Sequence, residues 1–415
     1  MPEPGPSGTF LDRFFRRQLK NRLARIGKGR INWIENGEME VFGSTSGDCP
    51  LEVSVQVNSP AVYRRIALRG SIGAGESYMA GEWDCDNLAD LVRILLLADR
   101  VVDAVDGGAV DAYGLFARVT NWAKRNNRAG SRANIAAHYD LGNDFYRLFL
   151  DDTMMYSCAF FEMGHETLEE ASSAKNDRIC RKLRLSPNDH VLEIGTGWGG
   201  FALHAATRYG CRVTTTTISR QQYEYARQRV REARLDDRIT VISEDYRDLA
   251  GQYDKLTSIE MVEAVGPEFY ETFFSQCGRL LKPCGAMLLQ SITIADRRYE
   301  QARKSVDFIK RHIFPGGCLP SVTALCKAMT AASDLQMVHL EDIGLHYATT
   351  LAHWRQRFLA HLDDVKALGF PDDFIRMWLF YFGYCEGAFL ERAIGDVQLV
   401  LAKPGYRQIP LVQTL

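Results

Sequence analysis

The stretch VLEIGTGWGG, residues 191–200, constrains the fold more than any other part of this 415-residue chain. It is an apolar run that ends in a glycine turn, which is typical of the first strand and turn of a nucleotide-binding unit. Gly195, Gly197 and Gly200 have the G-x-G-x-x-G spacing of dinucleotide-binding proteins. The same letters also fit the turn that binds S-adenosylmethionine, so the turn alone leaves two cofactors open.

From His190 onward, apolar strand patterns alternate with helical patterns. Helices are predicted over 201–209, 220–234 and 267–281, and the strands are HVLEIG, RVTTTTI, ITVIS, KLTSIEM and AMLLQSITI. This alternation predicts an α/β fold, with a doubly wound parallel sheet covered by helices on both faces. A ligand of such a sheet binds at the carboxyl ends of its strands. Near the end of the chain, VQLVLAKP predicts a late edge strand.

The N-terminal part is predicted to be a smaller α+β domain, because the chain is too long for one ordinary core. Alternating patterns in MEVFGS, LEVSVQV and YRRIALRG predict a small antiparallel sheet, and Leu88–Val102 predicts a helix. The polar stretch NWAKRNNRAGSRAN predicts a linker over residues 121–134. We therefore expect an accessory domain over 1–120 and a catalytic domain over 135–415.

The segment LDRFFRRQLKNRLARIGKGR, residues 11–30, combines a helical apolar stripe with positive charge. It holds eight Lys or Arg and one Asp, and Leu11, Phe14 and Leu19 recur at helical spacing. Such a helix can lie in a membrane interface, where anionic lipid headgroups attract its cationic face. A helix that docks on its own domain and exposes a basic face has the same pattern, so both interpretations stay open.

The choice between the two cofactors depends on an acidic residue. A dinucleotide fold places an Asp or Glu on the ribose about 20 residues past the first glycine. Here that zone is Thr214–Ser219, which contains no acid. S-adenosylmethionine carries a sulfonium and an ammonium, so carboxylates beside its pocket are favourable. Glu193 precedes the turn and Asp245 follows the third strand, and we therefore predict S-adenosylmethionine and not NAD.

Seven stretches taken together resemble the cyclopropane fatty acid synthase family, in the family's order over about residues 130–403. They are AAHYDLGNDFYRLFLDDTMMYSCAFF, VLEIGTGWGGFALHAA, TISRQQ, EDYRDL, SIEMVEAVGPEFY, KRHIFPGGCLPS and HYATTLAHW. The resemblance implies a Rossmann-like class I methyltransferase fold with a small accessory domain. It also implies transfer of a methyl or methylene group from S-adenosylmethionine to the cis double bond of an unsaturated phospholipid acyl chain, which gives a cyclopropane fatty acid.

The resemblance further implies which residues contact the cofactor. Those expected are Tyr139, Tyr156, Ser157, Glu193, Gly195, Thr196, Gly197, Gly199, Thr217, Ile218, Gln222, Asp245 and Tyr246. Asp245 and Tyr246 are expected near the adenine, and Tyr139 is expected to close the pocket over the methionine end.

Methyl transfer to an alkene leaves a carbocation on the acyl chain, so a proton must be removed before a ring can close. The sequence shows no Ser-His-Asp set, HExxH motif or paired-carboxylate site that could be the base. The resemblance implies a bound bicarbonate ion as general base, in a cradle of Cys158, Glu263, the backbone at Ile292, and Tyr347. In that cradle Glu263 can accept a hydrogen bond from bicarbonate and Tyr347 can donate one.

Gln290 departs from the commonest pattern of the family, in which many members have His at this position. Glutamine can still form hydrogen bonds, but it cannot become cationic. The change leaves open a methyl or methylene branch as the product, if the proton is lost from a different carbon. Cys385 matches a cysteine of the family, and we expect it to line the substrate channel and not to act as a nucleophile.

Composition limits the partners and the location. A net charge of −2 does not favour a nucleic-acid partner, and the histidines show no metal-ligand spacing. The longest apolar run, Met377–Tyr384, is far shorter than the roughly 20 residues of a membrane span. Scattered cysteines and a start without a signal-peptide pattern predict a cytoplasmic protein. The basic helix predicts peripheral association with the inner face of the membrane. The resemblance is compatible with a homodimer, which the sequence does not determine.

Three rival functions fit the pattern less well. A small-amine N-methyltransferase shares the Y-D-x-x-x-x-F-Y and Y-S-C motifs, but the basic helix and the cradle argue against amines. A catalytically silent lipid-binding protein would not need the intact glycine turn or Glu263. A dehydrogenase lacks its ribose acid. The nearest alternative is therefore a fatty acyl C-methyltransferase that makes a branch.

Overall fold

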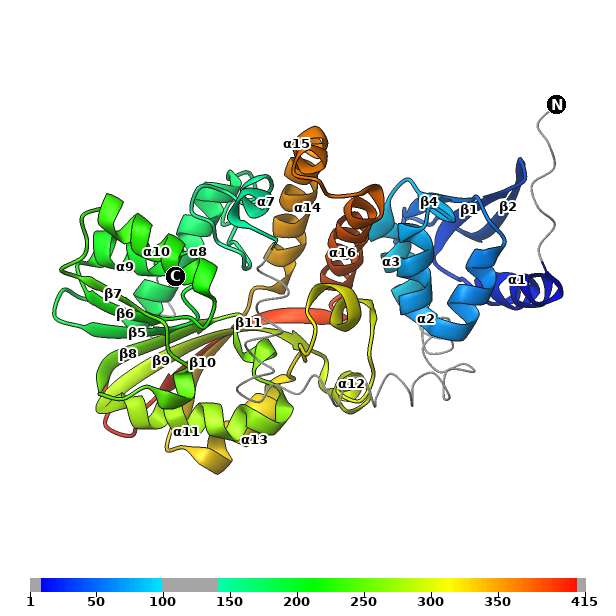
Figure 1. The fold of residues 1–415 in the computed structure, drawn as a ribbon. Coiled ribbons are helices and arrows are strands. Elements are labelled where there is room, and N and C mark those ends of the chain that lie inside the picture. The colour runs from blue at the N-terminus through cyan, green and yellow to red at the C-terminus, as the bar shows by residue number, and fades with distance from the viewer. Residues whose placement is uncertain (1–8, 99–140, 409–415) are drawn as a thin grey trace. The chain divides into compact units, whose positions relative to one another are not determined.

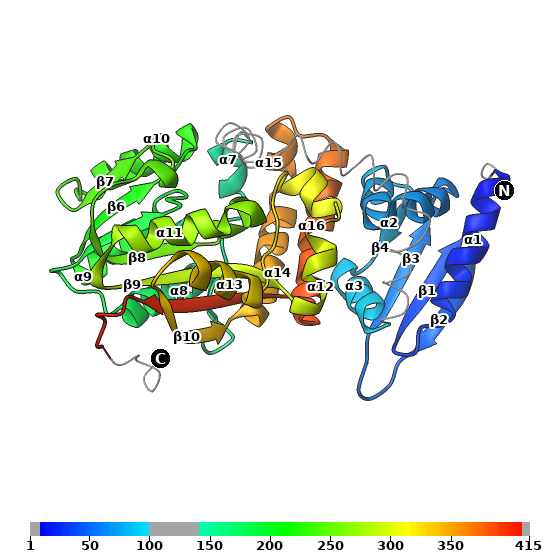
Figure 2. The same cartoon turned by 90° about the horizontal axis from the view of Figure 1, so that it is seen from below.

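The computed structural model describes residues 9–98 and 141–408, which form two compact units (Figures 1 and 2). The N-terminal unit holds the described residues up to 98 together with Ser305–Ile313 and Trp354–Ala393. The sheet unit holds the remaining described residues. The predicted linker over 121–134 lies outside the described residues. Each predicted domain, 1–120 and 135–415, was one continuous stretch of chain, whereas the N-terminal unit also includes two segments from the later part of the chain.

The sheet unit is built on seven strands in the order β10-β11-β9-β8-β5-β6-β7 (Figure 1). The strands are β5 (His190–Ile194), β6 (Arg212–Thr216), β7 (Ile239–Ile242), β8 (Tyr253–Ile259), β9 (Leu281–Ile294), β10 (Gln336–Asp342) and β11 (Ile394–Ala402). Strands β5 to β9 are parallel, which confirms the doubly wound α/β prediction. Strand β11 runs antiparallel between β9 and β10, so the prediction that it forms an edge was wrong. Its residues from 396 to 402 are all buried, as a central strand requires, and β10 is the half-exposed edge.

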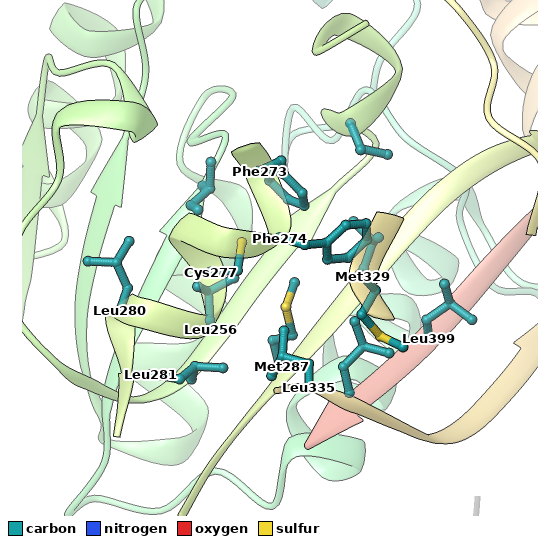
Figure 3. Close-up of a cluster of buried hydrophobic side chains, with 14 of the residues drawn as sticks. Leu256, Phe273, Phe274, Cys277, Leu280, Leu281, Met287, Met329, Leu335 and Leu399 are labelled. Carbon is teal, nitrogen blue, oxygen red and sulfur yellow. The ribbon is translucent and has the colours of Figure 1, made fainter. Parts of the chain in front are cut away.

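Helices cover both faces of this sheet. Helices α8 (Leu168–Leu183), α9 (Gly200–Tyr209) and α10 (Arg220–Glu232) pack on one face, and α11 (Tyr270–Leu280) and α13 (Val322–Ala332) pack on the other. Successive strand residues point to opposite faces, so Leu288 of β9 joins the first core and Met287 joins the second. Figure 3 shows the second core, where Phe273 and Phe274 of α11 lie against β8 and β9. The remaining α-helices that include described residues of this unit are α7 (Asn143–Arg147), α12 (Asp296–Ala302) and α14 (Gly344–Ala360). Short 3₁₀ helices are η1 (Tyr246–Asp248), η2 (Val262–Ala264) and η3 (Pro267–Phe269).

The N-terminal unit has a four-stranded sheet in the order β2-β1-β3-β4. Its elements before residue 98 are α1 (Phe10–Leu23), β1 (Gly29–Glu35), β2 (Glu38–Ser44), β3 (Glu52–Val57), α2 (Ala61–Met79), β4 (Trp83–Cys85) and α3 (Leu88–Leu97). The sheet is mixed, because β1 pairs parallel with β3, so the antiparallel prediction was only partly right. The predicted strand YRRIALRG is part of α2, which begins after Pro60. Proline is favourable where a helix begins, and the short alternating pattern could not exclude a helix.

Helix α16 (Asp372–Leu390) belongs to the N-terminal unit although the sequence analysis placed it in the catalytic domain. Two of its glycines allow close packing on α3. A Cβ at Gly383 would lie 2.6 Å from the Leu88 Cβ, and one at Gly387 would lie 2.5 Å from the Ala89 carbonyl oxygen. The unit also contains the short helices η4 (Ile309–Ile313) and α15 (Leu362–Ala367). Among the described residues, no helix combines the length and the apolar composition that a membrane span requires.

Candidate active site

The glycine turn follows β5 at the carboxyl edge of the sheet (Figure 1). Gly195 has φ +105°, a backbone conformation that L side chains rarely adopt. Its N–H donates to the Thr216 carbonyl at 3.0 Å, which ties the turn to the end of β6. Gly200 lies at the start of α9, where a Cβ would come within 2.4 Å of the Met155 sulfur. The glycines therefore set the shape of the turn and let the segment around Met155 pack against it.

Most of the predicted cofactor residues gather at this edge. Glu193, Gly195, Thr196, Gly197, Gly199, Thr217, Ile218, Gln222, Asp245 and Tyr246 lie at the ends of β5, β6 and β7 or in the segments that follow. Tyr156 and Ser157 lie in the segment before α8, and the Ser157 hydroxyl accepts a hydrogen bond from Lys175 at 3.0 Å. Tyr139 lies outside the described residues.

Two of these groups are held by neighbouring side chains. Thr215 donates to the Glu193 carboxylate at 2.6 Å, and burial raises the pKa of Glu193 to about 8. Asp245 forms an ion pair with Arg247 at 2.6 Å and caps the short helix that begins at Tyr246. A cation placed beside Glu193 would favour its ionised form. A left-handed glycine turn beside a buried carboxyl fits S-adenosylmethionine, whose sulfonium and ammonium are positive.

Glu260 follows directly after β8, and its carboxylate is the centre of a hydrogen-bond cluster that the sequence analysis did not anticipate. Three groups donate to it: the Cys158 N–H at 2.8 Å, Gln290 Nε2 at 2.7 Å and the Tyr347 hydroxyl at 2.8 Å. Cys158 and Tyr347 were predicted to hold a bicarbonate ion, and Gln290 is the position that departs from the commonest family pattern. Glu260 has φ +48°, which is uncommon for a residue with a side chain. The backbone strain points to a functional position.

Glu263 lies in the same loop, which we call the carboxylate loop (residues 260–263). Its Oε1 accepts hydrogen bonds from the Ser291 hydroxyl at 2.9 Å and from the Ile292 N–H at 2.5 Å. Its Oε2 is buried without a hydrogen-bond partner among the described residues. Burial and the neighbouring Glu260 raise the pKa of Glu263 to about 8. The backbone donor at Ile292 is thus engaged by Glu263 itself.

Asp396 of β11 is a third carboxyl group in this cluster. It is fully buried, accepts from Gln290 Nε2 at 3.0 Å, and also interacts with the Glu260 carboxyl. Burial and then the charge of Glu260 raise the pKa of Asp396 well above its usual range. Burial likewise raises the pKa of Glu260. Two carboxyl groups this close share a proton, because both cannot easily be charged.

A chain of side chains fixes the orientation of the Gln290 amide. Lys182 Nζ donates to Gln398 Oε1 at 2.7 Å, and Gln398 Nε2 donates to Gln290 Oε1 at 3.0 Å. Ammonium groups only donate, so each amide in the chain has its NH₂ group directed onward. The NH₂ of Gln290 must therefore point to Glu260 and Asp396. This explains why glutamine suits the position, since an imidazole nitrogen could donate to only one of them.

Lys175 of α8 supplies positive charge to the cluster. Its side chain is fully buried, and it interacts electrostatically with Glu260, Asp396 and Glu193. Burial lowers the pKa of Lys175 to about 8. The sequence shows Lys175 only as a polar residue within a helical pattern, which is why sequence reasoning missed it.

The two predicted cysteines differ in position. The Cys158 thiol is buried and donates to the Ala159 carbonyl at 3.2 Å, and burial raises its pKa well above the usual range. It contributes its backbone N–H to the cluster and is not a reactive thiolate. Cys385 lies on α16 in the N-terminal unit, where burial raises the pKa of its thiol. Its predicted place in a substrate channel stays a prediction.

The predicted cradle does not fit a bicarbonate ion in the described structure. Its donors at Cys158 and Tyr347 are engaged by Glu260, as is the nearby Gln290 amide, and its donor at Ile292 is engaged by Glu263. A further anion would also lie beside the negative charge that Glu260 and Asp396 share, which is electrostatically unfavourable. What the arrangement offers chemically is a protein carboxylate that is held by three hydrogen-bond donors.

A family model and two proteins of known name are similar to most of this chain. Residues 126–399 match the family described as "Mycolic acid cyclopropane synthetase". The chain is 37% identical to the cyclopropane-fatty-acyl-phospholipid synthase of Escherichia coli K12, over 90% of this chain and 94% of that protein. It is 36% identical to the tuberculostearic acid methyltransferase UfaA1 of Mycobacterium tuberculosis, over 87% of this chain and 86% of that protein.

Solved structures agree with these relatives. The cyclopropane synthase MmaA2 from Mycobacterium tuberculosis superposes with a TM-score of 0.61 at 30% identity, over 66% of this chain and 98% of that one. The mycolic acid cyclopropane synthase CmaA1, solved with S-adenosylhomocysteine (SAH), gives the same TM-score at 32% identity and the same coverage. Coclaurine N-methyltransferase shares only the fold, at 19% identity.

Proposed function

Because this chain belongs to the mycolic acid cyclopropane synthetase family, we propose that it is an S-adenosylmethionine-dependent enzyme that cyclopropanates unsaturated fatty acyl chains of phospholipids. The observation that carries this function is the contact between the glycine turn and the carboxylate loop. A Cβ built at Gly195 would lie 3.3 Å from the Met261 side chain. A methyl donor at the turn would therefore lie beside the loop that carries Glu260 and Glu263.

The residues of the site suit this chemistry. Bound S-adenosylmethionine supplies an electrophilic methyl group. Aromatic rings gather beside the turn: the centroids of Tyr146 and Trp198 are 4.9 Å apart, and those of Tyr146 and Tyr156 are 5.5 Å apart. Such rings exclude water and stabilise a carbocation without reacting with it. The carboxylate cluster supplies a proton acceptor. The resemblance had predicted a bound bicarbonate ion for that role.

A methyl-branched product is the second candidate, and one observation favours it. One relative, which aligns over 87% of this chain and 86% of its own, is named a methyltransferase, and another is named a cyclopropane synthase. Both products require the same methyl transfer. They differ in the carbon that loses its proton, which depends on how the acyl chain lies relative to the base.

The product can be identified by expressing the chain in a host that contains unsaturated phospholipids but forms no cyclopropane rings. We expect acyl chains that gain one CH₂ unit, with loss of the double bond and fragmentation typical of a three-membered ring. A methyl branch would establish the second candidate. Unchanged phospholipids together with methylation of added small amines would contradict both.

We also propose that α1 binds peripherally to the cytoplasmic face of the membrane. Phe10, Leu11 and Phe14 are exposed at 75%, 51% and 49%, and Arg13 and Arg17 are exposed beside them. These five residues form the α1 patch. An exposed apolar surface flanked by cations is typical of interfacial helices. A homodimer remains a prediction from resemblance.

Replacement of Arg13 and Arg17 by serine is expected to weaken binding to anionic vesicles by about 10- to 30-fold. The reason is that each cation near such a surface contributes about 1 kcal/mol. Co-sedimentation with phosphatidylglycerol vesicles measures this, and added salt should weaken wild-type binding. Serine at Arg208 and Arg231, exposed on the sheet unit, is the matched control. Equal binding by both double variants would leave α1 as a structural element.

A further inference from the structure

The carboxylate of Glu260 has the partners that a bound oxyanion would need. It accepts hydrogen bonds from a backbone N–H, an amide NH₂ and a phenol, at distances between 2.7 and 2.8 Å. A carboxylate and a bicarbonate ion present the same pair of negative oxygens to such donors. The side chain of Glu260 thus takes the donors at Cys158 and Tyr347, which the family resemblance assigned to the ion.

The hydrogen-bond network favours the ionised form of Glu260. All three partners donate, and the chain from Lys182 through Gln398 prevents the Gln290 amide from turning its oxygen toward Glu260. Hydrogen bonds to the charged form of an acid stabilise that form. Burial opposes them by raising the pKa of Glu260, which makes the carboxylate a stronger base.

The two acids of the pair, Glu260 and Asp396, differ in how deeply they are buried. Asp396 is fully buried, whereas Glu260 is partly exposed. Asp396 also interacts with the Glu260 carboxyl, so a proton taken up by Glu260 can be shared between them. Lys175 limits the negative charge of the cluster. The arrangement therefore pairs Glu260 with a more deeply buried acid that can take a share of its proton.

We propose that Glu260, in place of a bicarbonate ion, is the general base of this enzyme, an inference that rests on the proposed function. After methyl transfer, the acyl chain carries the positive charge and the transferred carbon carries three hydrogens. One of its C–H bonds breaks, and the electron pair forms the C–C bond that closes the ring. The proton moves to a Glu260 oxygen, and it leaves to water before the next turnover.

The first test compares Glu260→Gln with the wild-type enzyme on vesicles of unsaturated phospholipid in carbonate-free buffer. Wild-type turnover should not change when bicarbonate is added. Glu260→Gln should turn over about 10² to 10⁴ times more slowly, because an amide cannot accept the proton. Its affinity for SAH, measured by calorimetry, should stay within about twofold of wild type. Glu268→Gln is the matched control, because Glu268 is an exposed glutamate in the short helix Pro267–Phe269 that follows the carboxylate loop.

The second test uses Glu260→Gly, which relieves the positive φ and frees the three donors. We expect slow turnover that bicarbonate or acetate partly restores. In carbon-13 NMR, labelled bicarbonate should show a bound signal with Glu260→Gly and none with the wild-type protein. Circular dichroism checks that each variant is folded.

Three results would overturn the role of Glu260. They are a wild-type enzyme that needs bicarbonate, a wild-type protein that binds the labelled ion, and a Glu260→Gln protein with full turnover. If the wild-type enzyme forms neither a ring nor a branch on any phospholipid, the proposed function itself is contradicted, and the role of Glu260 with it.

Discussion

Replacement of Lys175 by methionine is expected to lower the free energy of unfolding by about 3–5 kcal/mol, the cost of leaving buried negative charge without the cation that offsets it. The side chain is fully buried, and its charge faces Glu260, Asp396 and Glu193. Methionine fills a similar volume, so the lower free energy of unfolding would result from the lost charge and not from a cavity. Chemical denaturation followed by circular dichroism measures the change.

Lys282→Met is the control for this prediction. Lys282 pairs with Asp254 at 2.6 Å, but its side chain is 45% exposed, and exposed ion pairs contribute about 1 kcal/mol or less. The contrast between the two variants should therefore be at least about 2 kcal/mol. Equal effects would mean that the carboxyl groups around Lys175 are neutral in the folded protein and need no cation.

Replacement of Gly195 by alanine is expected to weaken binding of SAH by about 10- to 100-fold. A side chain at φ +105° costs about 1–3 kcal/mol, and its Cβ would press on Met261 at 3.3 Å. The turn must relax away from the conformation that holds the cofactor. Titration calorimetry with SAH measures the loss.

Gly251→Ala separates this effect from general backbone strain. Gly251 has φ +101°, but a Cβ there meets only ordinary contacts with Tyr253, at 3.7 Å or more, in the loop before β8. Both variants should lose similar stability, and only Gly195→Ala should lose affinity. Unchanged SAH binding by Gly195→Ala would place the cofactor elsewhere on the sheet.

The role proposed for Glu260 gives a physical reason for the departure at Gln290. A histidine in this place would have one ring nitrogen for Gln398 and one for a single carboxylate. The Gln290 amide donates to Glu260 and Asp396 at once while its oxygen accepts from Gln398. Gln290 and Glu260 thus act together, because the neutral Gln290 amide holds the Glu260 carboxylate in the orientation that its proposed role as a base requires.

Local sequence determined the frame of the site. The run from His190 and the glycines at 195, 197 and 200 predicted the strand, the turn and the parallel sheet, because periodicity and left-handed turns are properties of a few consecutive residues. The missing acid in Thr214–Ser219 predicted the cofactor class in the same way. The resemblance, which rests on several such motifs, gave the family that the comparisons confirmed.

Only the tertiary structure decided which groups meet. Glu260 meets Cys158, Tyr347 and Gln290, which lie 102, 87 and 30 residues away along the chain. Their convergence depends on the pairing of β8, β9 and β11 and on the position of α14, and no local pattern encodes these. Nor did the sequence show that α16 packs on α3, because Gly383 approaches Leu88, which lies 295 residues earlier in the chain. Sequence fixes local periodicity and turn geometry, whereas the charge and the partners of a side chain depend on neighbours that only the folded chain brings together.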